Sequence, residues 1–321
     1  MHRRVAALLT LALLLSACSS GTETAEPVAP TTAATGPDPA TFAAQVASTD
    51  LWVGDPQDVQ IGVSSATEAE GVRLVTGGTV EVVFTPFGDE VSDEVIDARY
   101  LPAPGTEGDA QGPVGLTGPA TARGVYQADD VTFSEAGIWQ ADIAVEVEGT
   151  PVALQTQFEV YEAPRLPAPG QRALRTDSLT MDSDAEPAAI DSRAAETGEV
   201  PDPELHAMSI AETIDRGTPA LVLFATPVYC QSQFCGPDVE WLEGLAAERP
   251  DDAAYVHVEV WADYQTQTLN EAAADWLYRD EELTEPWLYL IDADGTIAER
   301  WGPLFDPAEV EAALDRVTDG G

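Results

Sequence analysis

The chain has 321 residues, a length that allows about two domains, and it carries 57 acidic against 14 basic residues, for a formal charge of −43. A field of that sign repels nucleic acid and anionic lipid headgroups, so we expect no nucleic-acid partner. We interpret the charge as a solvated acidic surface, and a preference for cationic partners stays open.

The N-terminus has the pattern of a secretion signal. Arg3 and Arg4 precede an apolar stretch from Val5 to Leu15, which is shorter than the about 20 residues that a bilayer-spanning helix needs. Small residues follow and lead to Cys18. The segment resembles the signal of bacterial lipoproteins, which implies removal of residues 1–17, lipidation of Cys18, and anchoring at the extracytoplasmic face of the cell membrane. An ordinary signal peptide with an incidental cysteine is the alternative.

Two segments have the composition of linkers. Residues 18–40 are rich in Thr, Ala, Pro and Glu, and we expect a disordered tether that follows the lipid anchor. Residues 164–203 are rich in Pro, Ala, Asp and Ser, and no helical or strand periodicity persists in them. We expect a second linker there.

Residues 41–163 predict an all-β domain. Short runs of β-branched and aromatic residues alternate with polar ones and are separated by Gly, Pro and Asp clusters. We expect strands over residues 59–63, 79–84, 124–128, 138–147 and 152–161. The stretch Gly124-Val125-Tyr126 … Phe133 … Gly137-Ile138-Trp139 resembles strand pairs of immunoglobulin-like domains, which implies a β-sandwich. The sequence does not identify a partner for it.

Residues 204–321 alternate between helical and strand patterns. Ser209 with Glu212 indicates a capping box at a helix start, and Pro237 and Pro307 suit first helical turns. Strands are expected where apolar runs are short and buried, as from Ala220 to Ala225. The expected order is α-β-α-β-α-β-β-α, over residues 209–216, 220–225, 236–248, 255–261, 270–278, 287–292, 296–301 and a last helix capped by Asp306.

This order, with two cysteines after the first strand, resembles the thioredoxin fold and in particular a TlpA-like thiol–disulfide protein. The matching features are Leu223-Phe224-Ala225-Thr226-Pro227 before Cys230, Cys235-Gly236-Pro237 at a helix start, and Thr284-Glu285-Pro286-Trp287 before the third strand. The resemblance implies that Pro286 holds the cis-proline position that faces the disulfide. The expected fold class is therefore an all-β immunoglobulin-like sandwich followed by an α/β thioredoxin-like domain.

The cysteine spacing departs from that family, because the chain has C-x4-C where thioredoxins have C-x-x-C. Counting from the strand makes Cys230 the attacking thiol and Cys235 the resolving one. Aligning Cys-Gly-Pro instead makes Cys235 the attacker and puts Asp238 in place of the second cysteine. A helix start favours a thiolate, whereas a nearby carboxylate, from Asp238 or Glu285, opposes it. We favour Cys230 as the attacker.

Residues five apart on a regular helix do not share a face, so a Cys230–Cys235 disulfide requires a loop or an unwound turn. We expect oxidation and reduction to remodel this segment.

The sequence therefore predicts a thiol–disulfide oxidoreductase that acts on protein thiols through Cys230 and Cys235, with Pro286 shaping the substrate side and no cofactor or metal. Three alternatives stay open. One is a binding or scaffold lipoprotein with a structural disulfide, and another is a thiol peroxidase, because some peroxiredoxins share the C-x4-C spacing. The third is copper delivery by the cysteines and a histidine, although we expect His257 to be a packed, hydrogen-bonded core residue and His206 to lie at the end of the linker.

Overall fold

The computed structural model describes residues 42–67, 71–106, 112–117, 123–230 and 232–319. The predicted signal peptide, Cys18 and the tether therefore lie outside the described residues. The described residues all belong to one compact unit, which spans residues 36–321. Within that unit no described helix is long and apolar enough to cross a membrane.

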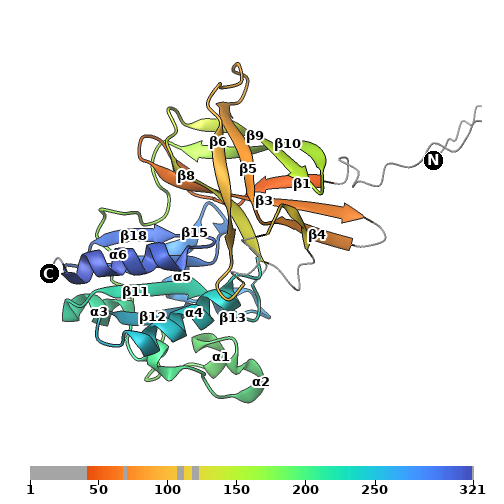
Figure 1. Cartoon of the computed structure of the whole chain (residues 1–321). Helices are drawn as coiled ribbons and strands as arrows, with labels where there is room; N and C mark the ends of the chain where they lie inside the picture. The colour runs from red at the N-terminus through yellow and green to blue at the C-terminus, as the bar shows by residue number, and fades with distance from the viewer. Residues whose placement is uncertain (1–41, 68–70, 107–111, 118–122, 231, 320–321) are drawn as a thin grey trace, which may run out of the picture. The chain divides into compact units, whose positions relative to one another are not determined.

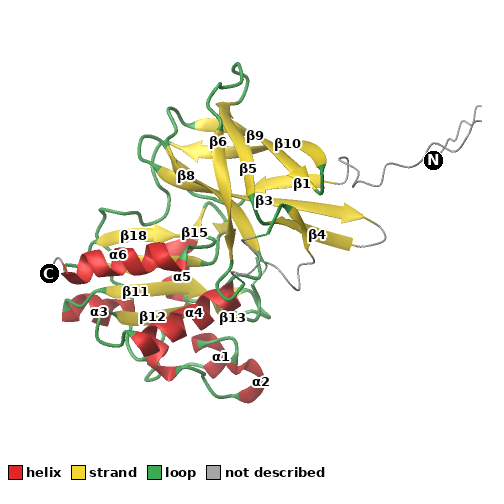
Figure 2. Cartoon of the chain, viewed as in Figure 1, coloured by secondary structure: helices red, strands yellow, loops and turns green. Residues whose placement is uncertain are grey.

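The N-terminal half of the unit is a single sheet of ten strands (Figures 1 and 2). The strand order is β2-β10-β9-β5-β6-β8-β3-β4-β7, and β1 pairs with β3. The five expected strands are confirmed within β3, β5, β8, β9 and β10. The bounds are β1 (Phe42–Val46), β2 (Leu51–Trp52), β3 (Gln57–Thr67), β4 (Gly71–Thr76), β5 (Thr79–Pro86), β6 (Ile96–Pro102), β7 (Gly115–Thr117), β8 (Gly124–Val131), β9 (Gly137–Val147) and β10 (Thr150–Tyr161).

Strand β6 makes the sheet continuous. Its first half pairs with β5, from Ile96 to Arg99, and its second half pairs with β8, from Arg99 to Pro102. The sheet curls, and alternate side chains of its strands fill one core. Phe84, Phe133 and Phe158 meet edge to face in that core, an arrangement that aromatic rings prefer.

The second sheet has four strands, β11 (Ala220–Ala225), β12 (Ala254–Glu259), β17 (Trp287–Ile291) and β18 (Ile297–Trp301), in the order β12-β11-β17-β18. Strand β12 is parallel to β11, whereas β17 runs antiparallel to both β11 and β18. One core packs against α3 (Ile210–Arg216) and α5 (Glu271–Leu277), and another packs against α4 (Cys235–Glu248) and α6 (Pro307–Asp319). Two hairpins, β13 (Trp261–Asp263) with β14 (Thr268–Leu269) and β15 (Tyr278–Arg279) with β16 (Glu282–Leu283), complete this part.

The predicted elements of this region are confirmed, and the capping box of α3 is present. The Ser209 hydroxyl accepts a hydrogen bond from the Glu212 amide at 3.2 Å, and the Glu212 carboxylate accepts one from the Ser209 amide at 2.8 Å. Val256, Val258 and Val260, which alternate along the sequence, share one core.

The predicted fold class is wrong. The described part of the chain is mostly β, with 41% of its residues in strands and 20% in helices, and the large curled sheet dominates it. An immunoglobulin-like sandwich needs two separate sheets, whereas here the hydrogen-bonded ladder runs unbroken through β9, β5, β6, β8 and β3. The smaller sheet with its hairpins does not form a clear α/β thioredoxin-like domain.

The segment expected to be a linker is packed in the structure. Residues 164–203 include α1 (Pro187–Ile190) and α2 (Ala194–Thr197), and the 3₁₀ helix η3 (Pro203–His206) begins at their end. Leu166 and Ala173 join the core under the second sheet, and Asp191 is fully buried. This segment therefore supplies core and polar interior groups.

Candidate functional site: the Cys230–Cys235 disulfide

The two cysteines lie where a buried strand passes into a helix. Strand β11 is buried along its whole length and ends at Ala225, and α4 begins at Cys235. Cys230 lies in the intervening loop and forms a disulfide with Cys235, with a Cα–Cα distance of 6.1 Å. The expectation that the bridge needs a non-helical segment is therefore confirmed.

The environments of the two sulfurs differ. Cys230 is half-buried, and its Sγ lies 3.2 Å from the Ser232 hydroxyl. The backbone amide of Cys235, in the first turn of α4, donates to the same Sγ at 3.4 Å. The sulfur of Cys235, in contrast, belongs to a residue with no exposed surface. Helix-start amides and hydroxyls stabilise an anion, so this environment favours a thiolate at Cys230.

Two carboxyl groups lie on the Cys235 side. Glu285 Oε2 is 2.7 Å from Cys235 Sγ. Asp238, three residues further along α4, is fully buried, and neither of its carboxyl oxygens has a hydrogen-bond partner. Burial raises the pKa of Asp238 well above its ordinary value, and the charge of Glu285 raises it further. Once the disulfide is reduced, a Cys235 thiol can donate to Glu285, which favours the protonated form of that sulfur.

Replacing Glu285 by Gln is expected to lower the pKa of the reduced Cys235 thiol by at least about 1 unit, because it removes a negative charge beside the sulfur. The comparison uses Cys230→Ser and Cys230→Ser/Glu285→Gln, so that Cys235 is the one thiol of the site. Thiolate absorbance in the ultraviolet, followed against pH, gives the pKa in each. Equal titration curves would show that Glu285 does not control this sulfur.

The Glu285–Pro286 peptide bond is cis, and Pro286 directly precedes β17. Glu285, in the same segment, contacts Cys235, and the role of Pro286 towards a substrate stays a prediction.

The large sheet contacts the loop that carries the cysteines. Phe234, directly before Cys235, is buried in a cluster with Leu101, Ala103 and Val125 of the large sheet and its β6–β7 loop, and with Leu304. The Arg123 guanidinium also donates to the Gln233 carbonyl at 3.3 Å. The large sheet therefore packs against the start of α4, which Cys230 contacts.

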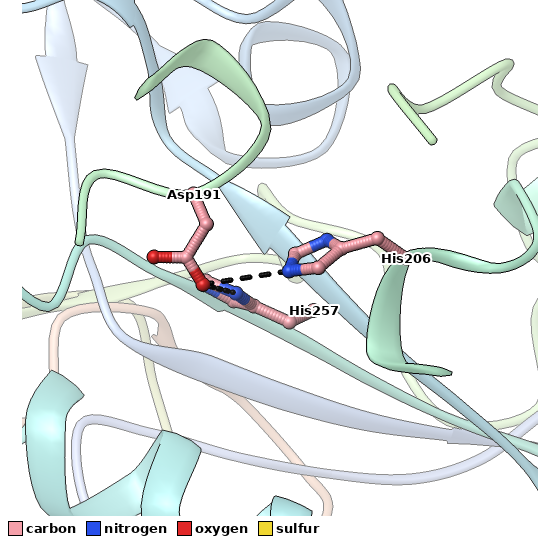
Figure 3. A group of neighbouring side chains, drawn as sticks. All are labelled: Asp191, His206 and His257. Carbon is pink, nitrogen blue, oxygen red and sulfur yellow. Dashed lines mark ion pairs between the residues drawn. The ribbon is translucent and has the colours of Figure 1, made fainter. Parts of the chain in front are cut away.

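The histidines lie with Asp191 and away from the disulfide in the described structure. His257 is fully buried and its Nε2 lies 3.2 Å from the Ala225 carbonyl, so the expected packed, hydrogen-bonded histidine is confirmed. His206 is also fully buried and, with His257, groups around Asp191 (Figure 3). The group of ligand atoms at the cysteines consists of Cys230, Cys235 and Glu285, with neither histidine.

Sequence reasoning missed the Asp191 group altogether. Its three members are far apart in the chain, and Asp191 lies in a segment whose composition suggested a linker. The group is nevertheless connected to the cysteine loop, because the Val228 amide donates to the hydroxyl of Ser192, the residue after Asp191, at 3.2 Å.

Comparison of the chain with models of protein families, with curated proteins and with solved structures finds no match.

Proposed function

We propose that this protein is a thiol–disulfide oxidoreductase that acts on protein clients through Cys230 and Cys235. The observation that carries the proposal is the asymmetry of the pair: one sulfur is partly accessible and contacts a helix-start amide, and the other is buried against a carboxylate. A purely structural disulfide needs no such difference. Exchange needs this difference, because one thiol must attack the client first and the other must then resolve the mixed disulfide.

The exchange proceeds in two displacements. In the direction of client reduction, the Cys230 thiolate attacks a client disulfide, forms a mixed disulfide and expels one client thiolate, which takes a proton from solvent. Cys235 then loses its proton and attacks Cys230 Sγ, which releases the second client thiolate. Two electrons pass from the dithiol to the client, and the Cys230–Cys235 disulfide forms. Client oxidation is the same sequence in reverse.

Glu285 is the group placed to accept the Cys235 proton, because its Oε2 is 2.7 Å from the sulfur. This carboxylate opposes ionisation of Cys235 until the mixed disulfide has formed, and it then receives the proton as the sulfur attacks. Asp238 is a second, buried carboxyl group, and burial and the charge of Glu285 raise its pKa.

The proposal includes a place of action. Lipidation at Cys18 would anchor the chain to the membrane, with the site on the extracytoplasmic side. The supporting observations are the lipoprotein-like pattern of residues 1–18 and the disulfide itself, since disulfides persist mainly in oxidising compartments.

The test is the reduction potential of the disulfide in the full chain, measured by equilibration with glutathione or dithiothreitol buffers. We expect a value between about −270 and −120 mV, the range of exchange-active proteins. A value well below about −300 mV is typical of structural disulfides and would favour a binding or scaffold lipoprotein. Consumption of peroxide faster than exchange with a protein disulfide would indicate a thiol peroxidase instead.

A further inference from the structure

Three polar side chains converge in the interior, away from solvent. Asp191 follows α1, His206 ends η3 and His257 lies on β12, and each is fully buried. Figure 3 shows one oxygen of Asp191 directed at both rings. This oxygen, Oδ2, is 3.4 Å from His206 Nε2 and 3.3 Å from His257 Nδ1, and the three atoms all lie within 4.8 Å of one another.

Arg193 donates hydrogen bonds to both oxygens of the Asp191 carboxylate, whereas the two histidine rings are poorly satisfied within the described structure. Three of the four ring nitrogens, both of His206 and Nδ1 of His257, are buried without a partner in hydrogen-bond geometry. The fourth, His257 Nε2, faces the Ala225 carbonyl, which can only accept, so Nε2 carries the proton. In a neutral His257 ring, Nδ1 then turns a lone pair towards Asp191. Two acceptors that face each other away from water repel unless a proton or a metal ion lies between them.

The spacing fits a tetrahedral metal ion. Metal–nitrogen and metal–oxygen bonds of about 2.0–2.1 Å place the ligand atoms about 3.3 Å apart along each edge of the tetrahedron. The separations of 3.4 and 3.3 Å from Asp191 Oδ2 to the two ring nitrogens match that edge, and the two nitrogens lie within 4.8 Å of each other. The hydrogen bond from His257 Nε2 to a backbone carbonyl is also the outer contact that metal-binding histidines make, because it fixes the tautomer and the ring orientation.

Charged side chains surround the cluster. Arg193 pairs with Asp191 at 2.7 Å and with Asp202 at 2.8 Å. Glu259, on the same strand as His257, is almost fully buried and accepts from the Ser192 amide at 2.8 Å. One guanidinium is thus shared between two carboxyl groups, and the Asp191 oxygen that it contacts also faces the two histidine rings.

We propose that Asp191 Oδ2, His206 Nε2 and His257 Nδ1 bind one divalent transition-metal ion of the zinc class, with water as the fourth ligand. Two imidazoles and a carboxylate are a ligand set for such ions. The ion would join the segment after α1 and the end of η3 to β12. Because Ser192 accepts from the Val228 amide, it would also fix the base of the cysteine loop.

The experiment uses the full chain, stripped of metal by a chelator, with the Cys230–Cys235 disulfide intact so that thiolates do not compete. Co²⁺ is titrated and followed by its visible ligand-field spectrum, and Zn²⁺ is then added. We expect one Co²⁺ per chain with the intense bands of tetrahedral coordination, displacement by Zn²⁺, and a higher melting temperature with Zn²⁺. Absence of a saturable spectrum in the wild-type chain would overturn the proposal, whatever the variants do.

Asp191→Asn and His206→Asn are each expected to weaken Co²⁺ binding by at least about 100-fold, since replacing even an outer partner of a metal ligand costs about 10–100-fold. Asp238→Asn is the matched control, because it replaces a fully buried carboxyl group outside the cluster and should leave the spectrum unchanged. Binding that survives both ligand variants, or that Asp238→Asn weakens equally, would place the ion elsewhere and contradict the assignment.

Discussion

The Cys235→Ser variant is expected to accumulate a mixed disulfide with a client protein, and Cys230→Ser is not. Cys235→Ser retains Cys230, whose sulfur is half-buried and contacts a helix-start amide. This sulfur can attack a client, but the mixed disulfide that forms cannot be resolved. Cys230→Ser retains a sulfur with no exposed surface beside Glu285. Both variants should lose turnover, since exchange requires the two sulfurs in succession.

The measurement is non-reducing electrophoresis after incubation with a model protein disulfide, supported by mass spectrometry of the adduct. Alkylation provides a second readout at neutral pH. Cys235→Ser, which keeps Cys230, should react faster than Cys230→Ser, because Cys230 contacts a helix-start amide whereas Cys235 is buried beside Glu285. Cys230→Ser/Cys235→Ser is the blank. Trapping by Cys230→Ser in preference to Cys235→Ser would reverse the roles and support the Cys-Gly-Pro alignment.

The local elements of the second half were predictable because short-range physics determines them. The capping pair Ser209 and Glu212 starts a helix, and the alternation of Val256, Val258 and Val260 marks one face of a strand. The disulfide was predictable too, because its partners are five residues apart and the compartment is expected to be oxidising.

Strand pairing across the first half was not predictable in the same way. The alternation in residues 79–84 and 138–147 indicates strands, but it does not say whether β6 ends one sheet or joins two halves of one sheet. Arg99 pairs with Thr79 on one side and with Gln127 on the other. Contacts of that kind connect residues far apart in sequence, and no local pattern records them. The sandwich prediction failed at this step.

The Asp191 cluster was missed for a related reason. Alternation did place His257 in a buried strand, but its partners come from residues 191 and 206, in and just after a segment of linker-like composition. That composition reflects short helices and turns, which lack a persistent period.

At the disulfide, the sequence indicated Glu285 and Asp238 as candidate carboxylates, and the structure assigns Glu285 the direct contact with Cys235.

Asp238 should make the protein less stable as the pH rises, and Asp238→Asn should remove that dependence. Burial and the nearby charge of Glu285 raise the pKa of Asp238 well above its ordinary 3.8. Between about pH 4 and the raised pKa, the folded state therefore holds a proton that the unfolded state has released. The stabilisation that this proton provides is complete below the pKa that Asp238 has in the unfolded chain. It falls as the pH rises, by up to about 1.4 kcal/mol per pH unit, and the loss levels off above the pKa that Asp238 has in the folded protein.

Urea unfolding of the oxidised chain from pH 4 to pH 8 tests this expectation. The substitution Asp238→Asn introduces a neutral amide of the same shape, so the unfolding free energy of this variant minus that of wild type should increase with pH across the window. Asp251→Asn, which changes an exposed carboxylate, should follow wild type throughout. Parallel curves for wild type and Asp238→Asn would show that Asp238 ionises in the folded protein without penalty. The buried carboxyl group could then hold no proton near Cys235 at neutral pH, and proton transfer in the proposed exchange would depend on Glu285 alone.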